Sequence, residues 1–317
     1  MPIRPITPET IQEAAAALAA GELVGMPTET VYGLAADATD PAAVARIYAA
    51  KGRPAFNPLI AHIPDIAAAR REAIFDARAE KLSESFWPGP QTLVLPARAD
   101  GSVCELARAG LSSIALRVPA HAAAQDLLRA FGKPLAAPSA NISGRLSPTN
   151  AENVAADLGD ALKLILDAGP CSVGVESTIV ALAPDQPARL LRPGGVARED
   201  IEALIGQLSA PQKVENGGAI EAPGMLSSHY APRARLRLNA DSPSEGEAFL
   251  AFGPDAPEGA LNLSAKGDLL EAAANLYAFL RQIDSQGAAM IAVAPIPHTG
   301  LGEAINDRLA RAAAPRP

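Results

Sequence analysis

The sequence predicts an α/β fold divided into two domains. Short apolar runs alternate with segments in which apolar residues recur at helical spacing, as expected when strands and helices form layers around a core. The 317 residues exceed what one core usually organises. Between Ser209 and Arg233 the periodicity is lost and Pro, Gly, Ser and Asn accumulate, which indicates a linker. We therefore expect a first domain over residues 1–208, a linker over 209–233 and a smaller α/β domain over 234–317.

The first expected element is a helix. Thr7 is a suitable N-cap, Pro8 suits the first helical position, and the apolar pattern continues to Gly21. Glu9 and Glu13 argue against a signal peptide. Strands are then expected at Leu23–Pro27, Leu59–Ile63, Thr92–Pro96, Ile114–Val118, Leu135–Ala137, Leu164–Leu166, Thr178–Leu182 and Arg189–Leu191. Helices are expected at Ala42–Ala50, Ala77–Phe86, Ala120–Ala130, Ala151–Leu158 and Glu199–Gln207.

The second domain repeats this alternation. Its expected strands are Leu236–Leu238, Ala248–Phe252, Leu261–Leu263 and Ile291–Ala294. One helical stripe, beginning near Asp268, consists of Leu269, Ala273, Leu276, Leu280 and Ile283, and a second consists of Leu301, Ile305 and Leu309. We interpret both stripes as core faces and assign them no chemistry.

Composition and charge narrow the classes of protein. Hydrophobic residues make up 49% of the chain, enough for a sizeable core. A net charge of −8 argues against a broad nucleic-acid-binding surface, which needs clustered Lys and Arg. The two cysteines, Cys104 and Cys171, are far apart and form no zinc or disulfide pattern, and no stretch approaches the roughly 20 apolar residues of a membrane span. We expect a cytoplasmic protein with no membrane partner and no metal site.

Acidic residues are missing from two stretches of this acidic chain. No Asp or Glu lies between Asp40 and Asp65, or between Asp126 and Glu152. The basic residues inside these stretches, with one histidine, are Arg46, Lys51, Arg53, His62, Arg129, Lys133 and Arg145. Such gaps suggest a pocket for anions, although chance clustering on a solvated face would give the same pattern.

Each stretch contains a candidate anion-binding segment. In the first, Lys51 and Arg53 flank a glycine, so a loop there would present an ammonium and a guanidinium to phosphate or carboxylate. In the second, Pro138–Gly144 and Ser147–Thr149 supply hydroxyl and amide groups before a helix, which suits phosphate binding and equally suits ordinary helix capping. The chain has neither a P-loop nor a GxGxxG dinucleotide fingerprint.

Nine blocks occur in the order seen in one known family. They are Pro27–Leu34 (PTETVYGL), Lys51–Pro54 (KGRP), Asn57–Ile60 (NPLI), Trp87–Pro90 (WPGP), Arg117–Pro119 (RVP), Pro138–Asn141 (PSAN), Ser147–Thr149 (SPT), Gly174–Thr178 (GVEST) and Leu191–Gly194 (LRPG). In this the chain resembles the YrdC/Sua5 family of threonylcarbamoyl-AMP synthases. Pro223-Gly224-Met225 and His229-Tyr230-Ala231-Pro232, followed by a second α/β domain, resemble the long Sua5 form.

The resemblance implies a twisted, mixed-sheet α/β domain with a concave, positively charged cavity for L-threonine and ATP. By motif position, the residues expected to contact threonine are Thr30, His62, Arg117, Ala137 and Ser177. Those expected to contact ATP are Arg53, Asn57, Ser113, Ser139, Ser147, Arg192 and Tyr230. Lys51, Arg53 and Asn141 are implied as the catalytic residues, with Lys51 and Asn141 near the phosphates or the bicarbonate.

The implied reaction joins L-threonine, bicarbonate or CO2, and ATP with its Mg²⁺, for the t6A modification of tRNA. The threonine amine forms a carbamate, which attacks the α-phosphorus and expels pyrophosphate. Such chemistry needs positioning and charge neutralisation more than a covalent nucleophile. Arg117 would hold the threonine carboxylate, and His62 would take up an amine proton or hydrogen-bond the substrate. Downstream threonylcarbamoyl transferase proteins, and tRNA indirectly, are the implied partners.

Tyr230 has two interpretations. It packs between the domains, or it belongs to a segment that folds over the cavity and excludes water. Leu226-Ser227-Ser228 departs from the family, whose members often have basic and aromatic residues there, so the resemblance does not extend to additional phosphate contacts from this segment.

Two other functions stay open at this stage. The first is a tRNA- or double-stranded-RNA-binding module without catalysis, which the acidic charge and the lack of an RNP-like aromatic set disfavour. The second is a carbamoyl-transfer domain of the hydrogenase-maturation type. Those proteins carry zinc-finger cysteines and an acylphosphatase segment that this sequence lacks.

Overall fold

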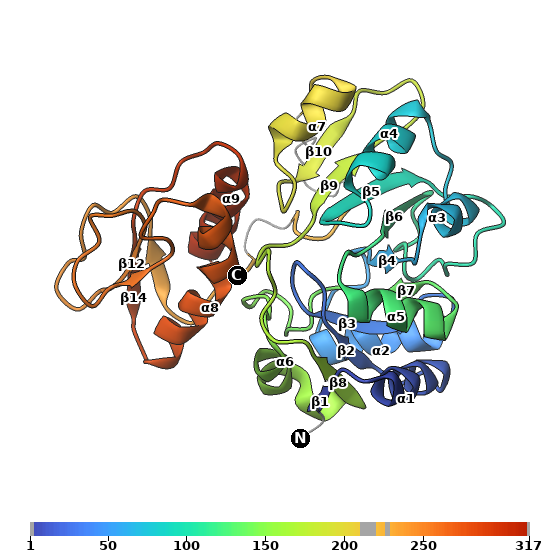
Figure 1. Ribbon diagram of the computed structural model, residues 1–317, viewed down its shortest axis with the longest axis horizontal. Coiled ribbons are helices and arrows are strands. Elements are labelled where there is room, and N and C mark those ends of the chain that lie inside the picture. Colours follow the sequence, from blue (N-terminus) through green and yellow to red (C-terminus); the bar gives the residue numbers. More distant parts are fainter. Residues whose placement is uncertain (1–2, 210–219, 226–228, 316–317) are drawn as a thin grey trace.

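The computed structural model describes residues 3–209, 220–225 and 229–315, which form two sheets flanked by helices (Figure 1). The larger sheet has ten strands in the order β1-β8-β2-β3-β7-β4-β6-β5-β9-β10 and mixes parallel and antiparallel pairs. Its strands are β1 (Ile3–Pro5), β2 (Val24–Met26), β3 (Gly33–Asp37), β4 (Ile60–His62), β5 (Gln91–Pro96), β6 (Ser113–Arg117), β7 (Leu135–Ala136), β8 (Leu164–Asp167), β9 (Thr178–Ala181) and β10 (Arg189–Arg192). The helices of this part are α1 (Pro8–Ala19), α2 (Pro41–Lys51), α3 (Ile66–Glu72), α4 (Ala77–Phe86), α5 (Ala122–Phe131), α6 (Ala151–Leu158), the 3-10 turn η1 (Gly159–Ala161) and α7 (Arg198–Ile205). The predicted mixed α/β fold is confirmed.

The smaller sheet is parallel and has the order β11-β14-β12-β13. Its elements are β11 (Arg235–Arg237), β12 (Ala248–Ala251), β13 (Leu261–Asn262), α8 (Leu269–Ser285), β14 (Met290–Val293) and α9 (Leu301–Ala313). Helices α8 and α9 lie on the side of the smaller domain that faces the larger one (Figure 1). The predicted stripes are confirmed as core faces, since Leu276, Leu280, Ile305 and Leu309 are buried in one cluster. Part of the expected linker, residues 210–219 and 226–228, lies outside the described residues.

Local sequence signals fix the ends of α1 and α2. Thr7 caps α1, as the sequence predicts, and the structure adds a capping box with Thr10. The Asp40 side chain caps α2 at its N-terminus by accepting a hydrogen bond from the backbone N–H of Ala42. Gly52 ends α2 in the left-handed region, with φ of 59°, which other residues adopt only at a cost. The turn leaves Lys51 as the last helical residue.

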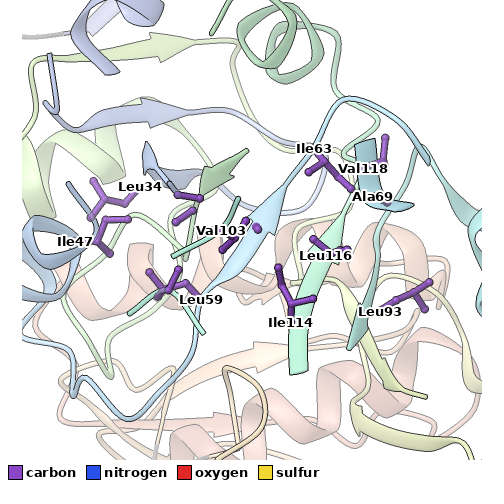
Figure 2. Packing of buried hydrophobic residues seen from close by; sticks show 14 of the residues in the cluster. Leu34, Ile47, Leu59, Ile63, Ala69, Leu93, Val103, Ile114, Leu116 and Val118 are labelled. Atoms are coloured by element: carbon purple, nitrogen blue, oxygen red, sulfur yellow. The ribbon is translucent and has the colours of Figure 1, made fainter. Parts of the chain in front are cut away.

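Alternation along the central strands separates a core face from a polar face. The side chains on the core face include Leu59, Ile63, Leu93, Ile114, Leu116 and Val118, which pack together in Figure 2. The intervening residues Ile60, His62, Ala115 and Arg117 therefore point to the opposite face of the sheet. This face carries the candidate site.

Four elements were not expected from the sequence: β1, β3, α3 and the 3-10 turn η1. Strand β3 consists of Gly, Leu, Ala and Asp without a β-branched residue, and it forms because β2 and β7 pair with it on either side. Strand β1 is three residues long and forms by pairing with β8, while α3 is too short to show a periodic pattern. None of the described helices has the length and apolar character needed to cross a bilayer.

Gln91 is a polar side chain on the core face of β5. It is 0% exposed, and neither its amide nitrogen nor its amide oxygen has a hydrogen-bond partner among the described residues. An unsatisfied buried group costs about 1–3 kcal/mol. We therefore expect Gln91→Met to raise the free energy of unfolding by about 1–3 kcal/mol in urea denaturation. Gln12→Met on the exposed face of α1 is the control, with a change within about 0.5 kcal/mol; equal effects of the two variants would contradict the prediction.

Candidate active site

A cavity lies over the polar face of the larger sheet. Its walls come from the turn before β3, the loop after α2, strands β4, β6 and β10, the segments after β7 and before β9, and the segment between the domains. The lining residues are Thr28, Thr30, Val31, Gly33, Arg53, Ile60, His62, Arg117, Ala137, Pro138, Ser139, Glu176, Ser177, Arg192, Pro223, Gly224, His229 and Tyr230. Three guanidinium groups thus converge from segments that are far apart in the sequence.

All five residues predicted to contact threonine line this cavity: Thr30, His62, Arg117, Ala137 and Ser177. His62 and Arg117 are neighbours because β4 and β6 pair in parallel with these two residues opposite each other. The turn that carries Thr30 is closed by Thr28, whose Oγ1 donates to the Val31 carbonyl at 2.6 Å and accepts from the Thr30 N–H at 3.2 Å. Local hydrogen bonds therefore hold Thr30 at the cavity.

Arg117 is anchored by three protein groups. Its Nε donates to the Gly89 carbonyl at 3.2 Å, Nη1 to Thr30 Oγ1 at 2.8 Å, and Nη2 to Glu29 Oε1 at 2.6 Å. Burial alone would raise the pKa of the Glu29 carboxyl, but the charge and hydrogen bond of Arg117 outweigh it and lower that pKa. A guanidinium has five N–H donors, so two remain for a substrate carboxylate.

His62 is buried and neutral at physiological pH. Burial, helped by the positive charge of Arg117, lowers the pKa of His62 to about 3. Its Nδ1 lies 3.3 Å from the Ile60 carbonyl oxygen, and in the tautomer that donates there Nε2 is a hydrogen-bond acceptor. His62 can therefore accept a hydrogen bond from an amine in the cavity.

Lys51 lies directly behind the cavity wall. Its Nζ donates to the carbonyl oxygens of Ser139 at 2.5 Å and Asn141 at 2.6 Å. Burial, followed by the nearby charge of Arg53, lowers the pKa of Lys51 well below its usual value. Lys51 thereby fixes the segment after β7, whose Ser139 lines the cavity.

Arg53 lines the cavity and is held by its own loop. Its Nη2 donates to Asn57 Oδ1 at 2.7 Å and to the Pro58 carbonyl at 2.8 Å, and Nε donates to the Asn57 carbonyl at 3.2 Å. Burial lowers the pKa of Arg53 to about 10. The Nη1 group has no hydrogen bond to any described residue, so it is available to a ligand.

Arg192 completes a set of buried cations. It donates from Nε and Nη2 to the Ser177 carbonyl, at 3.2 and 2.9 Å. Lys51, Arg53 and Arg192 are 2, 8 and 4% exposed, and within the described ranges none of them forms a salt bridge with a carboxylate. A buried charge is costly unless it is paired, so this set favours an anionic ligand.

Five predicted residues do not line the cavity: Lys51, described above, and Asn57, Ser113, Asn141 and Ser147. Asn57 and Asn141 hold Arg53 and Lys51, as described above, and Ser147 Oγ donates to Glu176 Oε1 at 2.5 Å. Ser147 is not a helix cap, since Asn150 caps α6. Ser113 begins β6 whereas Arg117 ends it, about 13 Å away along the strand. A contact between Ser113 and ATP stays a prediction.

Two buried carboxylates of the site were given no role from the sequence. Glu29 pairs with Arg117, and Glu176 lines the cavity and pairs with Arg308 of α9 at 2.7 Å. Burial alone would raise the pKa of Glu176, but Arg308, Arg192 and Ser147 lower it to about 2. Glu29 directly precedes Thr30 and Glu176 directly precedes Ser177, each inside one of the nine sequence blocks. A charged residue among small residues was the sequence signal that could have identified both carboxylates.

The segment between the domains also contributes to the cavity. Tyr230 is 2% exposed and lines the cavity. The guanidinium carbon of Arg308 lies 5.0 Å from the centroid of the Tyr230 ring. His229 packs edge-on against Tyr230, and burial lowers the pKa of His229 to about 3. Both interpretations of Tyr230 thus agree with its position; movement over the cavity stays a prediction, and the Leu226-Ser227-Ser228 departure lies outside the described residues.

Comparison with known families covers nearly all of the chain. The model for Sua5, YciO and YrdC proteins, described as "Telomere recombination", matches residues 16–194. A second model, described as "Threonylcarbamoyl-AMP synthase, C-terminal domain", matches residues 196–314. The larger and smaller sheets thus each have a family counterpart.

Individual relatives agree with the family models. The threonylcarbamoyl-AMP synthases of Bacillus subtilis and Pyrococcus abyssi are 41% and 40% identical to this chain, over 96% and 95% of it and 93% of each relative. The crystal structure of P. abyssi Sua5 complexed with L-threonine superposes with a TM-score of 0.88 at 38% identity, covering 98% of this chain and 96% of that one. E. coli YciO, at 22% identity and a TM-score of 0.55 over 61% of this chain, shares the fold of the larger domain. The chain belongs to the Sua5/YciO/YrdC family, in the form that carries the Sua5 C-terminal domain.

Proposed function

We propose that this protein is a threonylcarbamoyl-AMP synthase, a nucleotidyltransferase that makes threonylcarbamoyl-AMP for the t6A modification of tRNA. The observation that carries the proposal is the cavity itself. Thr30, His62 and Arg117 occupy one part of its wall, and the buried cations Arg53 and Arg192 occupy another. The cavity lining therefore combines groups suited to an amino acid with groups suited to a polyphosphate.

In the proposed reaction, the threonine carboxylate binds the two free N–H groups of Arg117. The threonine amine lies near the neutral His62, adds to CO2 or to bicarbonate with loss of water, and gives up a proton to form a carbamate. A carbamate oxygen then forms a bond to the α-phosphorus of ATP, and the bond to the departing pyrophosphate breaks. Arg53 and Arg192 offset the charge that develops on the phosphates.

Mg²⁺ enters this scheme as part of the ATP substrate. Among the described residues, Glu176 is the carboxylate that lines the cavity. Its two oxygens already bind Ser147, Tyr277 and Arg308. The metal is therefore expected to be held by the phosphates and water rather than by this carboxylate. The adenylate would pass to a transferase that places the threonylcarbamoyl group on tRNA.

The direct test is incubation of the purified protein with ATP, Mg²⁺, L-threonine and bicarbonate. We expect pyrophosphate release and an adenylate of the mass of threonylcarbamoyl-AMP, both lost when threonine or bicarbonate is omitted. Serine lacks one methyl group, so its kcat/KM should be lower by about 10- to 200-fold. No pyrophosphate release, together with steeply salt-dependent tRNA binding, would contradict the proposal and favour an RNA-binding module without catalysis.

A further inference from the structure

Glu176 is bound by both domains at once. Its Oε2 accepts from Arg308 Nε at 2.7 Å, the Tyr277 hydroxyl lies 3.1 and 3.0 Å from its two oxygens, and Ser147 Oγ donates to Oε1 at 2.5 Å. Tyr277 lies on α8 and Arg308 on α9, and both are buried. A side chain of the cavity lining is therefore held in place by two helices of the C-terminal domain.

These contacts leave Glu176 little capacity for chemistry. Each carboxylate oxygen has two lone pairs, and each oxygen already has two partners. Burial and the charge of Arg308 are the largest influences on the Glu176 carboxyl, and the net result is a pKa of about 2, which makes a poor base near pH 7. Glu176 is thus better suited to position other groups than to bind a metal or to accept a proton.

The interface around Glu176 is closely packed. A Cβ added to Gly174 would lie 2.4 Å from the Ala273 carbonyl oxygen of α8, so this position requires glycine. Arg308 Nη2 donates to the Pro193 carbonyl at 2.9 Å, next to Arg192 in the sequence. The apolar cluster of the smaller domain also extends to Val175. Helices α8 and α9 therefore contact the residues just before Glu176 and just after Arg192 in the sequence, and both Glu176 and Arg192 line the cavity.

We propose that Arg308 and Tyr277 are positioning residues for the synthase reaction, through which the C-terminal domain fixes and neutralises Glu176 and so keeps Arg192 available to ATP. The inference rests on the proposed function. The charges that act most strongly on Glu176 are those of Arg308 and Arg192. With Arg308 removed, Arg192 becomes the nearest counter-ion, and its guanidinium is drawn from the phosphates to the carboxylate. If Arg192 instead stays in place, an uncompensated negative charge faces the anionic substrate.

This arrangement predicts a diagnostic pH dependence. Without Arg308, burial raises the pKa of Glu176 while Arg192 still opposes the rise, so Glu176 gains a proton as the pH falls through the new value. Other groups facing Glu176 do not titrate near neutrality: burial lowers the pKa of His229 to about 3 and raises the pKa of both Tyr230 and Tyr277. Arg308 also pairs with Asp307, a half-buried carboxylate that pairs with Arg311 as well.

The experiment measures KM for ATP and for threonine in full-length Arg308→Met between about pH 6 and 8.5. At the high end of this pH range, we expect KM for ATP to rise about 10- to 100-fold, with KM for threonine much less affected. The rise should shrink as the pH falls, relative to wild type at the same pH. Arg308→Met/Glu176→Gln should recover part of the loss and show no such extra pH dependence.

The matched control is Arg198→Met, which breaks the ion pair between α7 and Glu303 of α9 but does not contact Glu176. A general loss of domain docking would affect both arginine variants alike, without extra pH dependence, and would overturn the proposal. Should Arg308→Met fail to fold, Tyr277→Phe decides by the same comparison: a selective rise in KM for ATP supports the proposal, and wild-type KM values refute it. An inactive wild-type protein would instead refute the proposed function.

Discussion

Arg53→Met is expected to lower kcat/KM for ATP by about 10²- to 10³-fold, the usual effect of removing one preorganised group that stabilises transition-state charge. Beside the larger effect of burial, Arg53 lowers the pKa of Lys51, and Arg192 lowers the pKa of Arg53. Within the described residues these three cations bind carbonyl, amide and hydroxyl oxygens rather than carboxylates. The ATP phosphates would relieve this repulsion. Methionine keeps most of the side-chain volume of Arg53 but removes its charge and its free Nη1 donors.

Ligand-induced stabilisation gives a second measure of the Arg53 effect. ATP at about 100 times its Kd should stabilise the wild type by about 2.7 kcal/mol, observed as a higher Tm, and the variant should show much less. Arg46→Met is the control: Arg46 lies on the exposed face of α2, the helix that precedes the Arg53 loop, so this variant should leave kinetics and ligand stabilisation unchanged. Near-wild-type kcat/KM in Arg53→Met would show that Arg53 does not bind the phosphates.

Sequence periodicity predicted most of the elements because each has a strong local signal. The helix at Pro41–Lys51, for example, has a capping Asp40, a proline at its first position and a glycine after its end. Strand β3, without β-branched residues, exists because two neighbours pair with it, and no local pattern records such pairing. Tertiary context thus decided the elements that were missed.

The site was only partly predictable, for a related reason. The stretches without Asp or Glu contain Lys51 and Arg53 but, by definition, no acidic residue. Glu29 and Glu176 are nevertheless buried at the site, each paired with an arginine that is more than 80 residues away in the sequence. Motif position grouped Thr30, His62 and Arg117, which line one cavity, and their contact with threonine stays a prediction. Their hydrogen-bond partners within the protein required coordinates.

The C-terminal helices illustrate the limit of the periodic pattern. Their apolar stripes were correctly interpreted as core, yet Tyr277 and Arg308 lie immediately beside stripe residues and face the other domain. A hydrophobic pattern identifies the face that packs in its own domain. It carries no information about which polar residues contact a second domain.

Arg117→Met is expected to have two separable effects. Glu29 would become a buried carboxylate without its counter-ion, which should lower the free energy of unfolding by about 3–5 kcal/mol. Threonine would lose the two guanidinium N–H groups assigned to its carboxylate, so KM for threonine should rise about 10- to 100-fold while KM for ATP changes little. Urea denaturation and steady-state kinetics measure the two effects.

The double variant Arg117→Met/Glu29→Gln separates stability from binding. Glutamine removes the unpaired charge and can still accept the hydrogen bond from the Ala120 N–H, so most of the lost stability should return. Threonine binding should not return with it, because no guanidinium has been restored. Recovery of both properties together would mean that Arg117 acts only by pairing with Glu29, and the threonine carboxylate would then need another partner in the cavity, such as the hydroxyl groups of Thr30 and Ser177.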